Sequence, residues 1–173
     1  MTSFQRYSCP AAGVVEAAPP SLGALRVGVG ARGGLFLPVA GEAFWIGIHV
    51  ARGSPSLDVA VLAALEDGCA VDTFSGIRPG RGRLPTRATV PPMLVLPGIR
   101  RPDGTSWWAL TSAPPPDAGP ACQGLVLAMW RRNRCVALAR IRLVDFAEFT
   151  ARTGLPPPPP LDPDAGYGGW RLP

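Results

Sequence analysis

The sequence contains no lysine, so all 17 of its basic residues are arginines, and it has a single asparagine among 173 residues. A GC-rich genome favours arginine codons over lysine codons, so this choice is not by itself evidence of ligand recognition. No run of about 18 apolar residues is present, and we therefore expect no transmembrane helix. The first residues, MTSFQRYSCPAAG, lack the apolar centre of a signal peptide. These absences predict a cytoplasmic protein that does not engage a membrane.

Motifs of the common enzyme and metal-binding classes are also missing. There is no GxSxG, HExxH or Walker-type loop, and the only histidine, His49, lies in the middle of a predicted strand, as a structural histidine does. The four cysteines are Cys9, Cys69, Cys122 and Cys135. They form no CxxC pair, which favours reduced thiols and argues against a zinc site. We predict no catalytic residue, no metal ligand and no cofactor.

Glycine and proline are abundant, with 21 and 22 copies, and this abundance favours short elements joined by many turns. Apolar residues alternate over residues 42–51 as they do in a strand, and residues 69–74 fit another strand. Alternation on both sides of turn signals predicts three hairpins, over residues 25–38, 93–112 and 123–143. We predict a mainly β fold, at the margin of the α+β class. It would be an antiparallel sandwich or partly open barrel with one or two short helices and a Pro-rich C-terminal strap.

Residues 54–68 fit two structures. Ser54 and Pro55 suit the cap and the first position of a helix, and Gly68 suits its end. The apolar residues that follow Pro55 nevertheless alternate, as they do in a strand. We predict a helix over residues 55–66 and keep a strand as the alternative.

The C-terminal part combines a helix signal with a proline run. Asp145 and Glu148 are spaced as in a capping box, which predicts a short helix that ends before Gly154. The five prolines at 156–160 predict a stiff, extended strap.

We divide the chain into an irregular lead-in over residues 1–22, a single β-rich domain over 23–154 and a Pro-rich tail over 155–173. The tail ends in a Gly-rich segment that contains Tyr167 and Trp170. These two aromatic residues are predicted to anchor the tail, either to the domain or to a neighbouring subunit in a homo-oligomer.

The basic residues are concentrated in the middle of the chain. Residues 76–142 contain eleven arginines against two acidic residues, a balance of +9, whereas the segments on either side are each about −2. A local excess of one charge attracts partners of the opposite charge, and arginine pairs with both carboxylates and phosphates. The basic middle therefore predicts an acidic partner.

Most of these arginines lie near predicted turns. We expect the hairpins over 93–112 and 123–143 to form one meander, which would place both turns at one end of the sheet. The turn arginines gathered there would be Arg100, Arg101, Arg131, Arg132 and Arg134. The neighbouring Trp107 and Trp108 must face opposite sides of a strand, so one is expected in the core and the other, assigned as Trp108, at the interface.

One short basic segment resembles a known motif. Arg78-Pro79-Gly80-Arg81-Gly82-Arg83-Leu84-Pro85 is similar to the AT-hook, a minor-groove DNA-binding motif with an Arg-Gly-Arg core beside proline. The resemblance covers about eight residues and implies that Arg81 and Arg83 enter a narrow A·T minor groove. The segment departs from the pattern at Gly80 and at Leu84, which separates Arg83 from the proline.

Three functions follow from these features. The first is a non-enzymatic binding or assembly module that meets an acidic protein partner through the arginines of its hairpin turns and Trp108. The alternative is a nucleic-acid-binding accessory protein that uses Arg78, Arg81, Arg83 and Arg87 together with the same basic end. The third is a small enzyme whose site forms only in three dimensions, around His49, one cysteine and an acidic residue.

Overall fold

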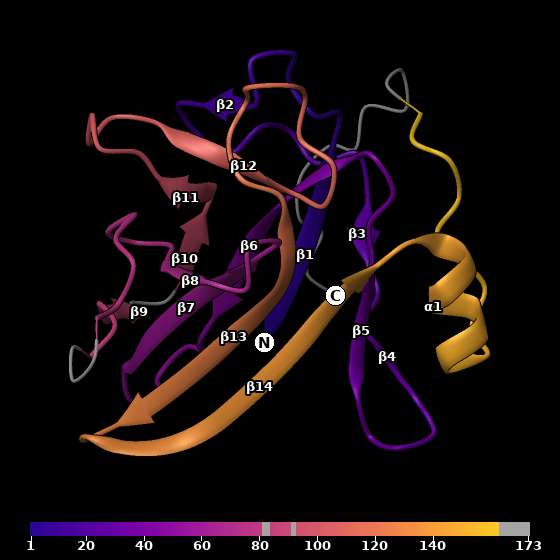
Figure 1. Ribbon diagram of the computed structural model, residues 1–173. Helices are drawn as coiled ribbons and strands as arrows, with labels where there is room; N and C mark the ends of the chain where they lie inside the picture. The colour runs from indigo at the N-terminus through magenta and orange to yellow at the C-terminus, as the bar shows by residue number, and fades with distance from the viewer. Residues whose placement is uncertain (81–83, 91–92, 163–173) are drawn as a thin grey trace.

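Two β-sheets packed face to face form the body of the protein, with one short helix beside them (Figure 1). The computed structural model describes residues 1–80, 84–90 and 93–162. Within these residues the strands form two seven-stranded sheets, and neither sheet closes into a barrel. The predicted mainly β, sandwich-like fold is therefore confirmed.

The first sheet is built around β6. Its main path is β11-β12-β6-β1-β3, while β10 also pairs with β6 and β2 with β12. The strands are β1 (Thr2–Tyr7), β2 (Val14–Val15), β3 (Ala24–Leu25), β6 (Ala43–His49), β10 (Met93–Leu96), β11 (Gly98–Arg100) and β12 (Trp107–Thr111). Strand β1 runs antiparallel to β6, in a register that joins Thr2 to Ile48 and Tyr7 to Ala43.

The second sheet contains the two longest strands of the described residues. Its order is β4-β5-β14-β13-β7-β8, with β9 also paired to β7. The strands are β4 (Gly28–Val29), β5 (Leu35–Pro38), β7 (Leu57–Leu65), β8 (Ala70–Asp72), β9 (Ala88–Val90), β13 (Cys122–Arg131) and β14 (Arg134–Val144). Strand β14 is antiparallel to β13 and parallel to β5, the latter over Ile141–Val144 only.

Apolar side chains from both sheets meet in one continuous core. Alternate residues of each strand point inward, as the pleat requires. Fully buried members of this core include Phe44, Ile46, Val59, Val61, Leu125 and Ile99. The rings of Phe4 and Phe44 pack edge to face with centroids 6.1 Å apart, which joins β1 to β6.

Two secondary-structure predictions are wrong. Residues 1–22 were expected to be irregular, yet residues 2–7 form β1 inside the first sheet. Residues 55–66 were expected to be a helix, yet β7 occupies 57–65 and pairs with β13 along its length. The alternation of Val59 and Val61 decided the structure of β7, because it buries one face of the strand in the core, and tertiary packing overrides helix propensity.

The rest of the lead-in covers the outer face of the first sheet. Side chains of β6 and β12, including Trp45 and Trp107, pack there against Cys9, Val15 and Ala18. The Trp45 indole N–H donates to the carbonyl of Pro19 at 3.0 Å. The outer face of this sheet is therefore shielded from solvent by the protein's own N-terminal segment.

The predicted capping box begins the predicted helix. Helix α1 (Phe146–Thr153) starts after Asp145, whose side chain accepts from the Glu148 N–H at 2.7 Å, and it ends at Gly154 in the left-handed conformation. Phe149 lies between Phe36 and Val144 and fixes α1 against β5 and the end of β14. In the part of the chain that the structure describes, no helix is long and apolar enough to cross a membrane.

Replacing Asp145 with alanine is expected to lower the free energy of unfolding by about 1 kcal/mol, because the first turn of α1 loses the acceptor for its N–H groups. Urea denaturation of the variant measures this loss. Asp145→Asn is the matched control, since asparagine caps about as well as aspartate. A loss with Asn as large as the loss with Ala would show that the side-chain oxygen does not act as a cap.

Candidate functional site

The two arginine-bearing hairpins exist, but they do not form one meander. Strands β11 and β12 belong to the first sheet, whereas β13 and β14 belong to the second. Figure 1 shows the turn between β11 and β12 at the upper left and the turn between β13 and β14 at the lower left, well apart. The expectation that five turn arginines gather at one end is therefore wrong. The chain changes sheet between β12 and β13, where the sequence gives only a Pro-rich connection.

At the β11–β12 turn, Arg100 is held by its own hairpin. Its guanidinium donates to the carbonyl of Gly104 and lies over the ring of Trp107, 4.6 Å from the centroid. These contacts hold the side chain against the turn, so the charge of Arg100 is directed at its own backbone.

Arg101 is engaged in the same way. Its Nη1 lies 3.3 Å from Oδ2 of Asp103 and donates to Oγ of Ser106 at 3.1 Å, and its guanidinium lies 5.8 Å from the Trp108 ring. Hydrogen bonds from Ser106 and Thr105, together with the Arg101 charge, hold the pKa of Asp103 down at about 2. Within this turn the carboxylate of Asp103 offsets the charge of Arg101.

The two tryptophans of β12 face opposite sides, as predicted. Trp107 packs on the outer cluster with Trp45, and Trp108 packs against the main core. Both side chains are half-buried. Trp108, assigned to the interface, is thus shared between the core and the Arg101 guanidinium.

The β13–β14 turn is different, because its arginines point into solvent. Arg131 and Arg134 pair across a two-residue turn formed by Arg132 and Asn133, and all four residues are exposed. Arg132 and Asn133 both have positive φ, 47° and 62°, which is the geometry of a type I′ turn. Such turns match the twist of the strands, so the backbone places these arginines together at the tip of the hairpin.

An apolar surface continues from this turn along the outer face of the second sheet. Val136 is 51% exposed and Leu138 is 61% exposed, and the half-buried Trp130 lies on the neighbouring strand. The guanidinium of Arg87 lies 4.2 Å from the centroid of the Trp130 ring. Over Val136 and Leu138 this apolar face is therefore open to solvent.

The AT-hook-like segment is described only in part. Arg81 and Arg83 lie outside the described residues. Arg78 forms an ion pair with Asp67 at 2.6 Å at the side of an open pocket that Leu65 and Pro120 also line. Arg87 is stacked on Trp130. The two described arginines of the alternative nucleic-acid site are therefore both engaged by residues of the protein.

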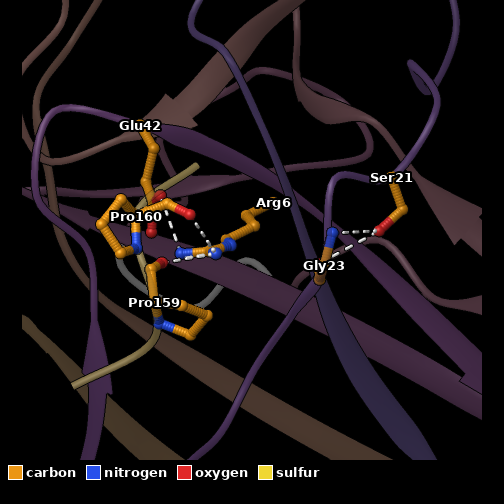
Figure 2. Close-up of polar contacts among 6 residues, drawn as sticks. All are labelled: Arg6, Ser21, Gly23, Glu42, Pro159 and Pro160. Carbon is orange, nitrogen blue, oxygen red and sulfur yellow. Dashed lines mark hydrogen bonds and ion pairs between the residues drawn. The ribbon is translucent and has the colours of Figure 1, made fainter. Parts of the chain in front are cut away.

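A buried ion pair was missed by sequence reasoning. Arg6 of β1 and Glu42, which precedes β6, have side chains only 4% exposed, with Nη1 and Oε2 3.4 Å apart. Figure 2 shows the Arg6 guanidinium lying between Glu42 and the proline strap, where its Nη2 donates to the carbonyl of Pro159 at 2.6 Å. The strap predicted over 156–160 is therefore fixed to the body of the protein in the same chain. Tyr167 and Trp170, the predicted anchors, lie outside the described residues.

The residues of the enzyme hypothesis come from several different elements of the fold. His49 is the last residue of β6. Burial raises the pKa of Cys9, and it raises the pKa of Cys122 to about 12, so these two thiols stay protonated and weakly nucleophilic. Cys69 contacts Arg78, and Cys135 is exposed on β14. Among the described residues, no cluster of three or more His, Cys, Asp or Glu side chains is placed to hold a metal ion.

Comparison of the chain with family models, with curated proteins and with solved structures finds no match.

Proposed function

We propose that this protein is a non-enzymatic binding module that engages an acidic protein partner through the β13–β14 turn. The observation that supports the proposal is the exposure of Arg131, Arg132 and Arg134 in and beside one two-residue turn. The segment from residue 118 to residue 144 contains five arginines and no acidic residue. The turn arginines therefore have no carboxylate neighbour in their own hairpin, unlike the arginines of the β11–β12 turn.

The proposed surface is narrower than the one predicted from the sequence. Arg100 and Arg101 already contact their own turn, and Trp108 packs on the core. Recruiting these side chains to a partner would first break internal contacts, whereas the β13–β14 arginines carry no such cost. Electrostatic attraction to a partner then acts mainly on the rate of association and on its salt dependence.

The test is affinity purification of the tagged protein from its host at low salt, with and without nuclease, followed by titration of the isolated partner. We expect an acidic protein that survives nuclease treatment. Its affinity should fall by roughly tenfold or more in the triple variant Arg131→Glu, Arg132→Asp, Arg134→Glu, because the partner then meets carboxylates. Aspartate is chosen at 132 because it tolerates positive φ better than glutamate does.

The matched control reverses three other exposed arginines by the same charge, Arg26→Glu, Arg32→Asp and Arg52→Glu. If both triple variants lose the same affinity for the partner, the partner responds to net charge alone. This result would contradict the proposed site. Recovery of nucleic acid as the common component would instead support the alternative function and direct attention to the segment that contains Arg81 and Arg83.

A further inference from the structure

Half of β14 lies at an open edge of the second sheet. On one side, β14 pairs with β13 from Arg134 to Arg142. On the other side, the pairing with β5 covers only Ile141–Val144. Among the described residues no further strand pairs with β14. Residues 134–140 therefore have a sheet partner on one side only.

The backbone groups that point out from this edge are identified by alternation along the strand. The carbonyl of Val144 accepts from the Val39 N–H at 2.8 Å, which places it on the β5 side of β14. Because backbone groups of alternate residues point to the same side of a strand, the N–H and C=O of Leu138 also point to that side. Leu138 lies before the first residue paired with β5, so its N–H and C=O face the open edge.

The side chains along this edge do not discourage pairing. Native proteins protect open edges with lysine, proline or inward-pointing charges, yet the segment Cys135–Ala139 reads Cys-Val-Ala-Leu-Ala. Val136 and Leu138 are each more than half exposed. A register shift in the β13–β14 ladder lies near Val136, so the regular part of the edge is centred on Leu138.

The charges around the edge distinguish between two occupants. A second copy of the chain, paired antiparallel about Ala137, would place Arg134 of each copy opposite Arg140 of the other. Moving the register by a few residues brings the turn arginines beside Arg140 or Arg142 instead. Like charges directly opposite each other destabilise a strand pair, so the edge disfavours its own copy and favours a strand with carboxylates at its ends.

We propose that the open edge of β14, residues 134–140, accepts a β-strand from the acidic protein partner, and that this strand has an apolar or Thr-rich centre with carboxylates at both ends. The inference rests on the proposed function and specifies how the partner binds there. Backbone hydrogen bonds to Leu138 provide affinity, while Arg134 and Arg140 select the charges of the incoming strand. The added strand would continue the sheet beside β5 and cover Val136 and Leu138.

The probe is the capped peptide acetyl-Glu-Thr-Ile-Thr-Val-Thr-Glu-amide, added to the full chain while amide exchange is followed by NMR. We expect the Leu138 N–H to exchange more slowly, whereas the exchange rates of the amides around Arg26, between β3 and β4, should not change. Two further forms of the peptide are N-methylated at alternate residues, so that each lacks the N–H donors on one side of the strand. Only one of these sides faces β14, so the affinity of one of the two forms should fall by roughly tenfold. A peptide with Arg in place of Glu should bind more weakly than the original.

Variants of the protein test the same contact from the other side. Leu138→Pro removes an N–H that points to the edge and leaves the ladder to β13 intact, because proline is tolerated where the N–H faces solvent. Leu138→Thr is the matched control, since it shortens the side chain but keeps the N–H. We expect the affinity for the peptide to fall by roughly tenfold or more in Leu138→Pro and by much less in Leu138→Thr.

The outcomes separate this inference from the function on which it rests. If the captured partner depends on Arg131, Arg132 and Arg134 but binds Leu138→Pro as it binds the parent chain, strand addition is refuted and the binding function stands. If Leu138→Pro does not fold, equal binding of the parent peptide and both N-methylated forms refutes strand addition by itself. A parent chain that sediments as a dimer dissociated by Leu138→Pro would assign the edge to a second copy and overturn the proposal.

Discussion

Replacing Arg6 with methionine is expected to lower the free energy of unfolding at about pH 8 by about 3–5 kcal/mol, because it leaves the Glu42 carboxylate buried without its partner. Arg6 and Glu42 have side chains only 4% exposed. The Arg6 guanidinium also donates to the carbonyls of Pro159 and Pro160, at 2.6 and 3.4 Å. One side chain thus joins β1, the entry to β6 and the strap, and its loss affects all three.

The effect of Arg6→Met should depend on pH in a defined direction. Burial raises the pKa of Glu42, and the Arg6 charge partly offsets that rise. Without Arg6 the pKa of Glu42 rises further. A carboxyl with a raised pKa in the folded state binds more protons when folded than when unfolded, so stability falls as pH rises from the unfolded-state pKa to the folded-state pKa. The deficit of Arg6→Met should therefore be largest at about pH 8 and smaller at about pH 5.

Urea denaturation followed by tryptophan fluorescence at the two pH values measures this difference. The double variant Arg6→Met, Glu42→Leu is the informative control, because replacing both partners of a buried pair with apolar residues is often close to neutral. It should recover most of the lost stability at about pH 8 and remove the extra pH dependence. A single variant that is no less stable than the double variant at either pH would show that Glu42 does not need Arg6.

Local signals in the sequence predicted the elements that depend on local interactions. The turn signal Pro102-Asp103-Gly104 between β11 and β12 and the capping box of Asp145 each specify a structure within four or five residues. Strand β1 was missed because its partner strand is distant in the sequence. Thr2 pairs with Ile48, and no pattern in the first residues predicts this pairing. The sheet that each hairpin joins is likewise decided by long-range packing, so the predicted meander could not be tested from turn signals alone.

The candidate site shows the same division between local and long-range information. The sequence located the turn arginines, because Arg131, Arg132 and Arg134 lie in or beside a short turn that alternation on both sides defines. Whether an arginine side chain is free to bind a partner depends on its neighbours in three dimensions. Arg101, for example, contacts Asp103 and Trp108. The open edge of β14 could not be predicted either, because it follows from how far β5 extends along its neighbour.

The second large effect concerns Asp72, a buried carboxylate at the end of β8. Its Oδ1 accepts from the N–H groups of Phe74 and Ser75, at 2.9 and 3.3 Å, and its Oδ2 accepts from the N–H of Thr86. One side chain therefore fixes both ends of the loop over residues 73–87. The same part of the sequence contains Arg78 and the AT-hook-like segment, so Asp72 contacts described residues on both sides of that segment.

Replacing Asp72 with alanine is expected to lower the free energy of unfolding by about 2–4 kcal/mol, because three backbone N–H groups lose a charged acceptor inside the protein. Urea denaturation measures the total loss. Hydrogen exchange locates it, since the amides of Phe74, Ser75 and Thr86 should all exchange faster while those of β13 change little.

Asp72→Asn divides this effect between the two ends of the loop. With the amide oxygen at the Oδ1 position, the N–H groups of Phe74 and Ser75 keep their acceptor, whereas the N–H of Thr86 faces an NH₂ group. We therefore expect faster exchange at Thr86 alone. Because Thr86 precedes Arg87, whose guanidinium lies over Trp130, the fluorescence of Trp130 should change in both variants. If the exchange of all three amides rises equally in Asp72→Asn, the two carboxylate oxygens do not have the separate roles described here. If the exchange of the Thr86 amide is unchanged in Asp72→Ala, Asp72 does not hold Thr86 in place.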